Sequence, residues 1–154
     1  MPTAENLLQI GRKRGRIQKL AYSGAFTPTE AYTLLKADPG AVLVDVRTNA
    51  ERDWVGRVVI NEKQHVSLQW AQYPGGIPNP DFLSQLAKIA EKGTILIFLC
   101  RSDIRSRLAA TLATEHGYHN SFDILEGFEG DKNANGHRKS ISGWCKAGLP
   151  WIGT

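Results

Sequence analysis

Several features that would define a protein class are missing from this sequence. No apolar run is long enough for a transmembrane helix, and there is neither an internal repeat nor a low-complexity tract. The sequence has no Cys-x-x-Cys pair, no glycine-rich phosphate loop with a lysine and no dinucleotide-binding fingerprint. His116 and His119 lie at the end of a predicted helix, where solvation or carbonyl capping is commoner than metal binding. We therefore expect a globular domain without a metal or cofactor.

The order of residues at the start of the chain also argues against export. A short apolar patch, Leu7, Leu8 and Ile10, comes before the first positive charges, whereas a secretory signal begins with them. We predict a cytoplasmic protein with no membrane partner. The 154 residues suit one domain with a sizeable core, since 42% are hydrophobic and 22% are charged.

The net charge of +4 comes from one segment. The first 20 residues contain a single acidic residue, Glu5, and five basic residues: Arg12, Lys13, Arg14, Arg16 and Lys19. Such a cluster can attract nucleic acid or anionic lipid, but a solvated, partly disordered tail or a short basic helix is the commoner explanation. We predict a basic segment over residues 1–24, a domain over residues 25–154, and no nucleic-acid partner.

Alternating strand and helix patterns follow the basic segment. Apolar runs rich in β-branched residues predict strands over residues 41–46, 94–99 and 121–125, with weaker candidates over 58–60 and 65–68. Helices are expected after the capping residues Thr27 and Asn79, and over 48–54, 103–116 and 142–147. Residues 73–80 are dense in Pro and Gly and predict a loop. Strands alternating with helices indicate an α/β domain with a parallel sheet.

The segment around Cys100 has the pattern most typical of an active site. A buried strand is predicted to end at Cys100, a short loop follows, and a helix begins at Asp103. Ligands of open α/β sheets bind beyond the carboxyl ends of the strands. Loop amides, the positive end of the helix dipole and the guanidinium groups of Arg101 and Arg105 would all favour a thiolate and bind an incoming oxyanion.

A simpler explanation is that Cys100 is a small buried side chain at the end of a strand. The residues after it favour a reactive cysteine, because they include two arginines and two serines, with Ile104 as the one bulky apolar residue. The candidate site is therefore Cys100 with the loop residues Arg101, Ser102, Asp103, Ile104, Arg105 and Ser106.

The pattern Cys-Arg-Ser-x-x-Arg-Ser over residues 100–106 resembles the active-site loop of rhodanese domains, whose cysteine becomes a persulfide. Other segments resemble family motifs in the family's order: Leu43–Arg47 followed by Glu51 and Gly56, then Gly127–Gly130, then Gly143–Trp151. Together they cover roughly residues 25–151. The resemblance implies a rhodanese fold, a parallel sheet with helices on both faces, and sulfurtransferase activity.

Under this resemblance Cys100 is the nucleophile, and the amides of residues 101–105 form a cradle around its sulfur. Arg101 faces the substrate and Arg105 closes the loop. The thiolate takes the outer sulfur of thiosulfate or a related donor and passes it to a thiol, or to cyanide in an assay, without a cofactor. Proteins as well as small molecules are candidates for donor and acceptor.

Three further charged residues bear on the site. Asp45 either pairs with an arginine and braces the loop or caps the turn after its strand, and both roles remain open. Arg47 is expected to brace an acidic residue such as Glu51. Asp103 stands where the family usually has glycine; its charge opposes a nearby anion unless the side chain caps the helix. It would also favour an organic persulfide over a dianionic donor.

Two other functions fit parts of the pattern. Cysteine-dependent phosphatases and arsenate reductases related to this family have five residues between cysteine and arginine, whereas four separate Cys100 from Arg105. A rhodanese-type binding module has no working cysteine, whereas Cys100 and both arginines are present here. We therefore favour the sulfurtransferase.

The remaining cysteine and the tryptophans have simpler roles. Cys145 either resolves the persulfide by forming a disulfide or packs beside Trp144, and we favour packing. Trp54 and Trp70 are expected to be core or pocket-wall residues. Trp70, followed by the Pro- and Gly-rich loop, would wall the pocket.

Overall fold

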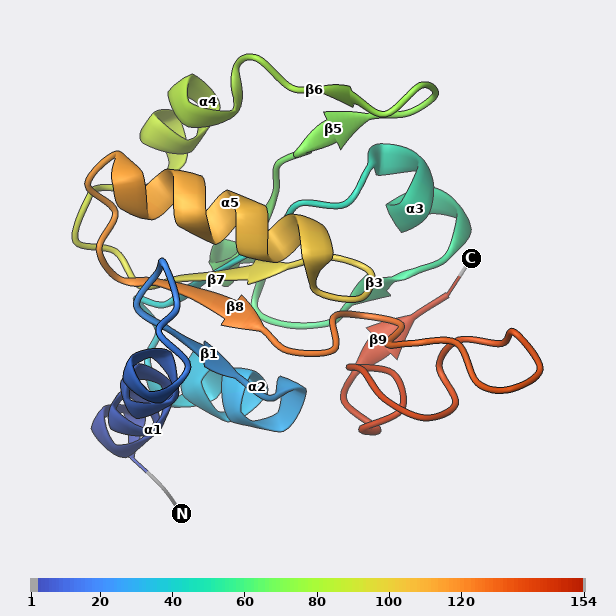
Figure 1. Ribbon diagram of the computed structural model, residues 1–154, viewed down its shortest axis with the longest axis horizontal. Coiled ribbons are helices and arrows are strands. Elements are labelled where there is room, and N and C mark those ends of the chain that lie inside the picture. The colour runs from blue at the N-terminus through green and yellow to red at the C-terminus, as the bar shows by residue number, and fades with distance from the viewer. Residues whose placement is uncertain (1–2, 154) are drawn as a thin grey trace.

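Five parallel strands form the centre of the protein. In the computed structural model, which describes residues 3–153, they lie in the order β1-β8-β7-β2-β4 (Figure 1). Their bounds are Gly24–Phe26 for β1, Val42–Asp45 for β2, His65–Ser67 for β4, Leu96–Leu99 for β7 and Ser121–Ile124 for β8. Each neighbouring pair runs parallel. The parallel sheet that the sequence predicts is confirmed.

Helices cover both faces of this sheet (Figure 1). Helices α1 (Ala4–Ile17) and α2 (Pro28–Ala37) pack on one face, and α4 (Phe82–Ile89) and α5 (Ile104–Glu115) pack on the other. The short α3 (Asn49–Trp54) follows β2. The expected α/β fold with helices on both faces of a central parallel sheet is therefore confirmed. Within residues 3–153, no helix combines the length and the apolar character needed to cross a bilayer.

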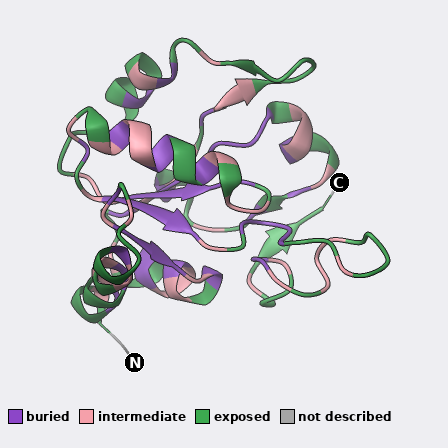
Figure 2. Cartoon of the chain, viewed as in Figure 1, coloured by how far each residue is buried: buried purple, intermediate pink, exposed green. Residues whose placement is uncertain are grey.

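The strands direct their side chains alternately into two cores. Leu43 and Ile97 point into the core that contains α1 and α2, and their neighbours Val44 and Phe98 point into the core that contains α4 and α5. All four side chains are fully buried, and Figure 2 shows the buried strands between more exposed helices. A strand covered on both faces needs apolar residues at successive positions, which explains the uninterrupted apolar runs in the sequence.

Helix α2 begins where the sequence predicts. The Thr27 hydroxyl accepts a hydrogen bond from the Glu30 amide at 3.2 Å, and the Glu30 carboxylate accepts one from the Thr27 amide at 2.8 Å. These reciprocal bonds satisfy two amides that have no partner inside the helix. Pro28 occupies the first turn, where its missing N–H is not needed. The Glu30 carboxylate also binds Arg14 at 2.9 Å, which joins α2 to α1.

Two predicted helix features are wrong. Residues 142–147 form turns rather than a helix. Gly143 and Gly148 adopt φ values of +100° and +76°, which a right-handed helix does not contain. Helix α4 begins after Asp81 rather than after Asn79, whose side chain instead accepts a hydrogen bond from the Asp81 amide at 3.0 Å.

The remaining elements are short and lie at the carboxyl edge or the surface. Strand β3 (Arg57–Val58) pairs antiparallel with β9 (Trp151–Ile152), and β5 (Ala71–Gln72) pairs antiparallel with β6 (Ile77–Pro78). A 3-10 turn covers Glu62–Gln64. The predicted strand over 58–60 is therefore shifted and shortened, and the predicted loop over 73–80 is largely the tip of a small hairpin.

The basic segment forms a helix that packs against the sheet. A Cβ atom on Gly24 of β1 would overlap the carbonyl group of Gly11 in α1, so the two elements can approach closely only through glycine. The Arg14 guanidinium also donates to the carbonyl of Ala25 at 2.6 Å. Of the two expected forms, helix and disordered tail, the helix is the one observed for α1. The domain boundary after residue 24 stays a prediction.

Replacing Gly24 tests this contact. Gly24→Ala is expected to lower the free energy of unfolding by about 1–3 kcal/mol, because the added methyl group must push α1 away from β1. Gly93→Ala is the matched control, since a Cβ atom there meets no atom within 4 Å. Urea unfolding measures both variants. Equal stability of the two would show that α1 does not depend on this close approach.

Candidate active site

Cys100 lies at the carboxyl end of the central strand β7. This strand has β2 on one side and β8 on the other, and α5 begins after a loop over residues 101–103. The Cys100 side chain is 1% exposed. The strand, loop and helix expected around this cysteine are therefore present, at the edge where α/β sheets bind ligands.

Two polar groups contact the Cys100 sulfur. The amide of Asp103 donates a hydrogen bond to Sγ at 3.1 Å, and the Ser106 hydroxyl oxygen lies 3.2 Å from Sγ. The first turn of α5 brings the positive end of its dipole to the same loop. An amide donor and a helix N-terminus both stabilise an anionic sulfur relative to the neutral thiol.

The backbone conformation of Asp103 directs its amide at the sulfur. Its φ of +92° lies in the region that glycine adopts easily and other residues rarely adopt. Asp103 occupies the N-cap position of α5 without a capping bond from its side chain, so the capping role considered for it is not formed. The carboxylate instead pairs with Arg107 at 3.3 Å. Burial raises the pKa of Asp103, and the charge of Arg107 opposes this effect.

The segment after β8 holds the loop through its backbone. The amide of Phe128 donates to the carbonyl of Cys100 at 2.8 Å, and that of Glu129 donates to the carbonyl of Arg101 at 2.9 Å. Gly127 has a φ of +69°, and a Cβ atom there would overlap the Arg101 carbonyl group. The two backbones can therefore approach only because residue 127 is glycine, a role that its spacing in the sequence did not reveal.

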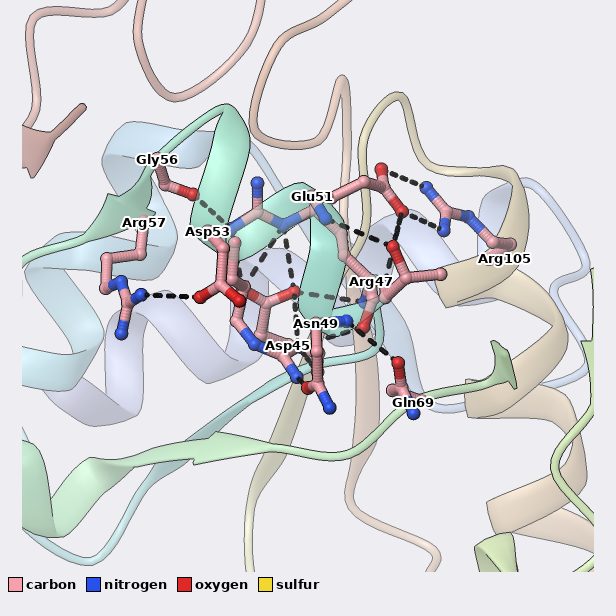
Figure 3. A network of polar contacts seen from close by, with 11 residues as sticks. Asp45, Arg47, Asn49, Glu51, Asp53, Gly56, Arg57, Gln69 and Arg105 are labelled. Atoms are coloured by element: carbon pink, nitrogen blue, oxygen red, sulfur yellow. Dashed lines mark hydrogen bonds and ion pairs between the residues drawn. The ribbon is translucent and has the colours of Figure 1, made fainter. Parts of the chain in front are cut away.

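Arg105 reaches across to α3 (Figure 3). Its guanidinium contacts both carboxylate oxygens of Glu51, at 2.6 and 2.8 Å. Burial by itself would raise the pKa of Glu51, but the hydrogen bonds and charge of Arg105 outweigh burial and lower this pKa to about 2. The pair ties the start of α5 to α3, which fixes one side of the loop.

Asp45 and Arg47 form a fully buried ion pair after β2 (Figure 3). The Arg47 guanidinium contacts both carboxylate oxygens at 2.8–3.2 Å, and the Arg47 amide donates to the same carboxylate at 3.1 Å. Asp45 therefore caps the turn after its strand and also pairs with an arginine, but the part of the expectation in which this pair braces the loop is not seen. Arg47 pairs with an acidic residue as expected, but this residue is Asp45, because Glu51 binds Arg105 instead. Arg47 also donates to the carbonyl of Gly56 at 2.8 Å, so the pair braces this turn rather than the loop after β7.

A cavity of about 590 Å³ lies beside the loop. Trp54 and Tyr73 meet edge to face on its wall, with ring centres 5.7 Å apart. Trp70 joins them, so the expectation that Trp70 and the following loop wall a pocket is confirmed. Arg101 and Arg105 line the side nearest the loop. The volume lies within the range of about 300–1,000 Å³ that is usual for small-molecule sites.

Asp123 belongs to the site although the sequence analysis did not identify it. It lies on β8, is fully buried, and accepts a hydrogen bond from the Ser106 hydroxyl at 2.5 Å. Since Ser106 also contacts the Cys100 sulfur, the three side chains form a continuous chain. The one signal in the sequence is a carboxylate inside the apolar run over residues 121–125.

Cys145 lies apart from this group. It packs against the core that contains α1 and α2, whereas Cys100 lies in the core on the opposite face of the sheet. Both thiols are free. Burial raises the pKa of Cys145 to about 11. This placement agrees with the packing role favoured for Cys145.

His116, for which solvation or carbonyl capping was expected, contacts a backbone carbonyl. Nδ1 of His116 lies 3.0 Å from the carbonyl oxygen of Leu112. Across residues 3–153, no three His, Cys, Asp or Glu side chains gather in a way that could hold a metal ion.

The model of the Rhodanese-like domain family matches residues 27–134, which contain β2, the Cys100 loop and β8. The chain belongs to this family. The resemblance seen in the sequence motifs is thus confirmed over most of the rhodanese-like fold described above.

Three bacterial proteins match this chain over most of their own length. The crystal structure of the M. tuberculosis protein Rv0390 has 41% identity and a TM-score of 0.79, and the match covers 86% of this chain and 99% of that one. An uncharacterised protein of Rickettsia conorii is 36% identical over 126 residues, which are 80% of this chain and 92% of the relative. The thiosulfate sulfurtransferase GlpE of Haemophilus influenzae is 28% identical over 127 residues, which are 80% of this chain and 90% of the relative. The similarity therefore extends well beyond the loop.

Removing the charge of Glu51 tests its pair with Arg105. Glu51→Gln is expected to lower the free energy of unfolding by about 1.5–3 kcal/mol at neutral pH. The pKa of Glu51 falls from a usual 4.5 to about 2 in the folded protein. The stabilisation by the ion pair is therefore complete at pH values above 4.5, and it is lost as the pH falls from there toward the pKa of the folded state. The stability difference between parent and variant should therefore narrow in acid.

Chemical denaturation from neutral to acidic pH measures this difference. Asp53→Asn is the control, since Asp53 forms an exposed pair with Arg57 and should contribute little at any pH. A Glu51→Gln difference that stays constant down to strongly acidic pH would contradict the assignment.

Proposed function

We propose that this rhodanese-like protein is a sulfurtransferase in which Cys100 carries sulfur as a persulfide. The observation that supports it most is the environment of the sulfur, which accepts an amide hydrogen bond at 3.1 Å beside the N-terminus of α5. Both the thiolate nucleophile and the persulfide are anions on sulfur, and this environment stabilises both.

The reaction consists of two displacements. The Cys100 thiolate attacks the outer sulfur of a sulfane donor such as thiosulfate; a new S–S bond forms, the donor's S–S bond breaks, and sulfite leaves with the electron pair. The acceptor, a thiolate or cyanide, then attacks the terminal sulfur of the persulfide, and the Cys100 thiolate leaves. No electron is supplied or removed, so the cycle needs no oxidant, metal or organic cofactor.

The loop residues have separate roles in this scheme. The amide of Asp103 holds the charge on sulfur, and Ser106 supports it from the side of α5. Arg101 is exposed, lines the cavity and forms no ion pair within residues 3–153, so its charge is available to an anionic donor. Ser102 completes the loop, and Ile104 begins α5. The name of the H. influenzae relative, a thiosulfate sulfurtransferase, supports the same reaction class.

The loop disfavours a phosphatase or arsenate reductase. Four residues separate Cys100 from Arg105, one fewer than such enzymes have. The Arg105 guanidinium would have to bind the oxyanion, but Glu51 already holds it with two hydrogen bonds. A binding module without catalysis remains the alternative that the mass experiment below decides.

The cavity favours an organic sulfur compound as donor or acceptor. Its volume of about 590 Å³ is far larger than a small inorganic anion requires, and its aromatic wall stabilises an apolar body by burial. Arg101 can pair with one anionic group of such a compound. The carboxylate of Asp103 would repel a second negative charge near the sulfur.

The persulfide is tested by intact mass. Incubation with thiosulfate or an organic sulfane donor should add one sulfur atom, which cyanide or a reductant removes. Cys100→Ala should abolish this gain and the turnover without unfolding the domain, whereas Cys145→Ala, the matched control, should retain both. No gain from either class of donor by the folded, reduced protein would favour the binding module, and a persulfide in Cys100→Ala would refute the assignment.

A pair of donors tests the aromatic wall. Benzenethiosulfonate and methanethiosulfonate share the reacting group and differ in the aromatic body. We expect kcat/KM to be about tenfold higher for the benzene compound, since burying part of its ring contributes roughly 1.4 kcal/mol. Trp54→Ala should remove this preference and change the methane compound less than about twofold.

Ile141→Ala replaces an exposed apolar side chain outside the cavity and serves as the control, because it should keep the preference. Equal kcat/KM values for the two donors in the parent protein would contradict the role given to the aromatic wall.

A further inference from the structure

Three buried side chains form a hydrogen-bonded chain behind the loop. The Cys100 sulfur lies 3.2 Å from the hydroxyl oxygen of Ser106, which donates to the carboxylate of Asp123 at 2.5 Å. Their exposed fractions are 1% for Cys100 and 0% for Ser106 and Asp123. The residues come from β7, α5 and β8, so the packing of α5 across these two strands brings them together.

Asp123 has few groups that could stabilise a negative charge. Its Oδ1 accepts the Ser106 hydrogen bond, but its Oδ2 is buried without a hydrogen-bond partner. No cationic side chain within residues 3–153 forms an ion pair with it. Burial raises the pKa of Asp123 to about 8, although the Ser106 hydrogen bond acts in the opposite direction. A buried carboxylate in this setting binds a proton readily.

The other titratable groups that face Asp123 come from the surrounding elements. Asp103 and Arg107, at the start of α5, act on it with opposite signs. Arg107 is largely exposed and pairs with Asp103 at 3.3 Å. Tyr22, before β1, has a pKa raised mainly by its own burial and further by Asp123. None of these groups supplies Asp123 with a buried cationic partner.

The Cys100 sulfur is better placed to hold a negative charge than Asp123. It accepts a hydrogen bond from the Asp103 amide and lies at the N-terminus of α5, whereas Asp123 has one carboxylate oxygen without a hydrogen-bond partner and, within residues 3–153, no cationic partner. We propose that Asp123, acting through Ser106, accepts the thiol proton of Cys100, so that the two acids share one negative charge that resides on the sulfur. The inference rests on the proposed function, which needs Cys100 as a thiolate.

The proton moves along the chain without a change in total charge. The Cys100 thiol gives its proton to the Ser106 oxygen while Ser106 gives its own proton to Asp123. The S–H and the Ser106 O–H bonds break, a new Ser106 O–H and a carboxylic O–H form, and the charge passes from carboxylate to sulfur. During sulfur transfer the charge stays on sulfur, first as thiolate and then as persulfide. Asp123 can therefore keep its proton throughout the cycle as a positioning residue.

Alkylation by iodoacetamide at different pH values tests the link. Measurements use the Cys145→Ala background, so that Cys100 is the one thiol that reacts. In Asp123→Asn the amide N–H replaces the carboxylic O–H as donor to Ser106, so the pH midpoint of alkylation should move by less than about half a unit. In Ser106→Ala the link is broken, and the midpoint should rise by about one unit or more.

If Asp123 is ionised while Cys100 is a thiolate, Asp123→Asn should shift the pH midpoint of alkylation clearly. Removing a nearby negative charge favours the thiolate, so Asp123→Asn would then lower the midpoint by about one unit or more. That outcome would overturn the proposal. An unchanged midpoint in Ser106→Ala would also overturn it, because Ser106 would then not connect the two acids.

Infrared spectroscopy tests the proton on Asp123 directly. At a pH at which alkylation shows that Cys100 is a thiolate, the parent protein should show the carbonyl stretch of a buried carboxylic acid. Asp123→Asn should lose this band, and Asp103→Asn should keep it, which separates Asp123 from the other carboxyl group with a raised pKa. A reactive thiolate without such a band in the parent refutes the shared charge even if a variant fails to fold.

Both measurements are independent of turnover. If the band and the midpoints behave as expected but Cys100 accepts no sulfur, the proposed function fails and the Asp123 link stands. If Cys100 forms the persulfide while Asp123 is ionised, the link fails and the proposed function stands.

Discussion

The parallel pairing of β7 between β2 and β8 is the constraint on which the site depends. Parallel strands have their carboxyl ends at the same edge of the sheet, so the residues that follow them must meet there. The register places Leu99 beside Asp45 and Phe98 beside Asp123. Cys100, the Glu51-bearing helix α3 and the Asp123 carboxylate therefore converge, although they are distant in sequence.

Most charged side chains around this edge form ion pairs with one another. Asp45 holds Arg47, and Glu51 holds Arg105. These pairs fix the turn after β2 and the start of α5, while Arg101 remains exposed on the side of the cavity. The Cys100 sulfur thus contacts one backbone amide and one hydroxyl at a helix N-terminus rather than a charged side chain, which would suit the thiolate and persulfide of the proposed function.

Strong local patterns were enough to predict much of the fold. The apolar runs that became β2 and β7, the Thr27 cap of α2 and the sequence from Cys100 into α5 were read correctly because their signals lie within a few residues. The helix expected over 142–147 did not form, since Gly143 has a positive φ and lies so close to the backbone of Glu129 and Gly130 that a Cβ atom would overlap it. An acidic partner of Arg47 was expected, but Glu51 was named as the example and Asp45 is the partner, because ion pairs depend on which side chains the fold brings together.

The sequence by itself determined the alternation of elements, the family and the cysteine that ends the central strand. These features could be predicted because the burial of a strand on both faces and the capping of a helix each depend on a short run of neighbouring residues. Only the tertiary structure decided that Glu51 binds Arg105, that Gly127 lets a second backbone approach the loop, and that Asp123 reaches Cys100 through Ser106. Each of these contacts joins segments that are far apart in the chain. Their distances in space depend on the packing of α5 and the loops against the sheet, which a local sequence pattern does not determine.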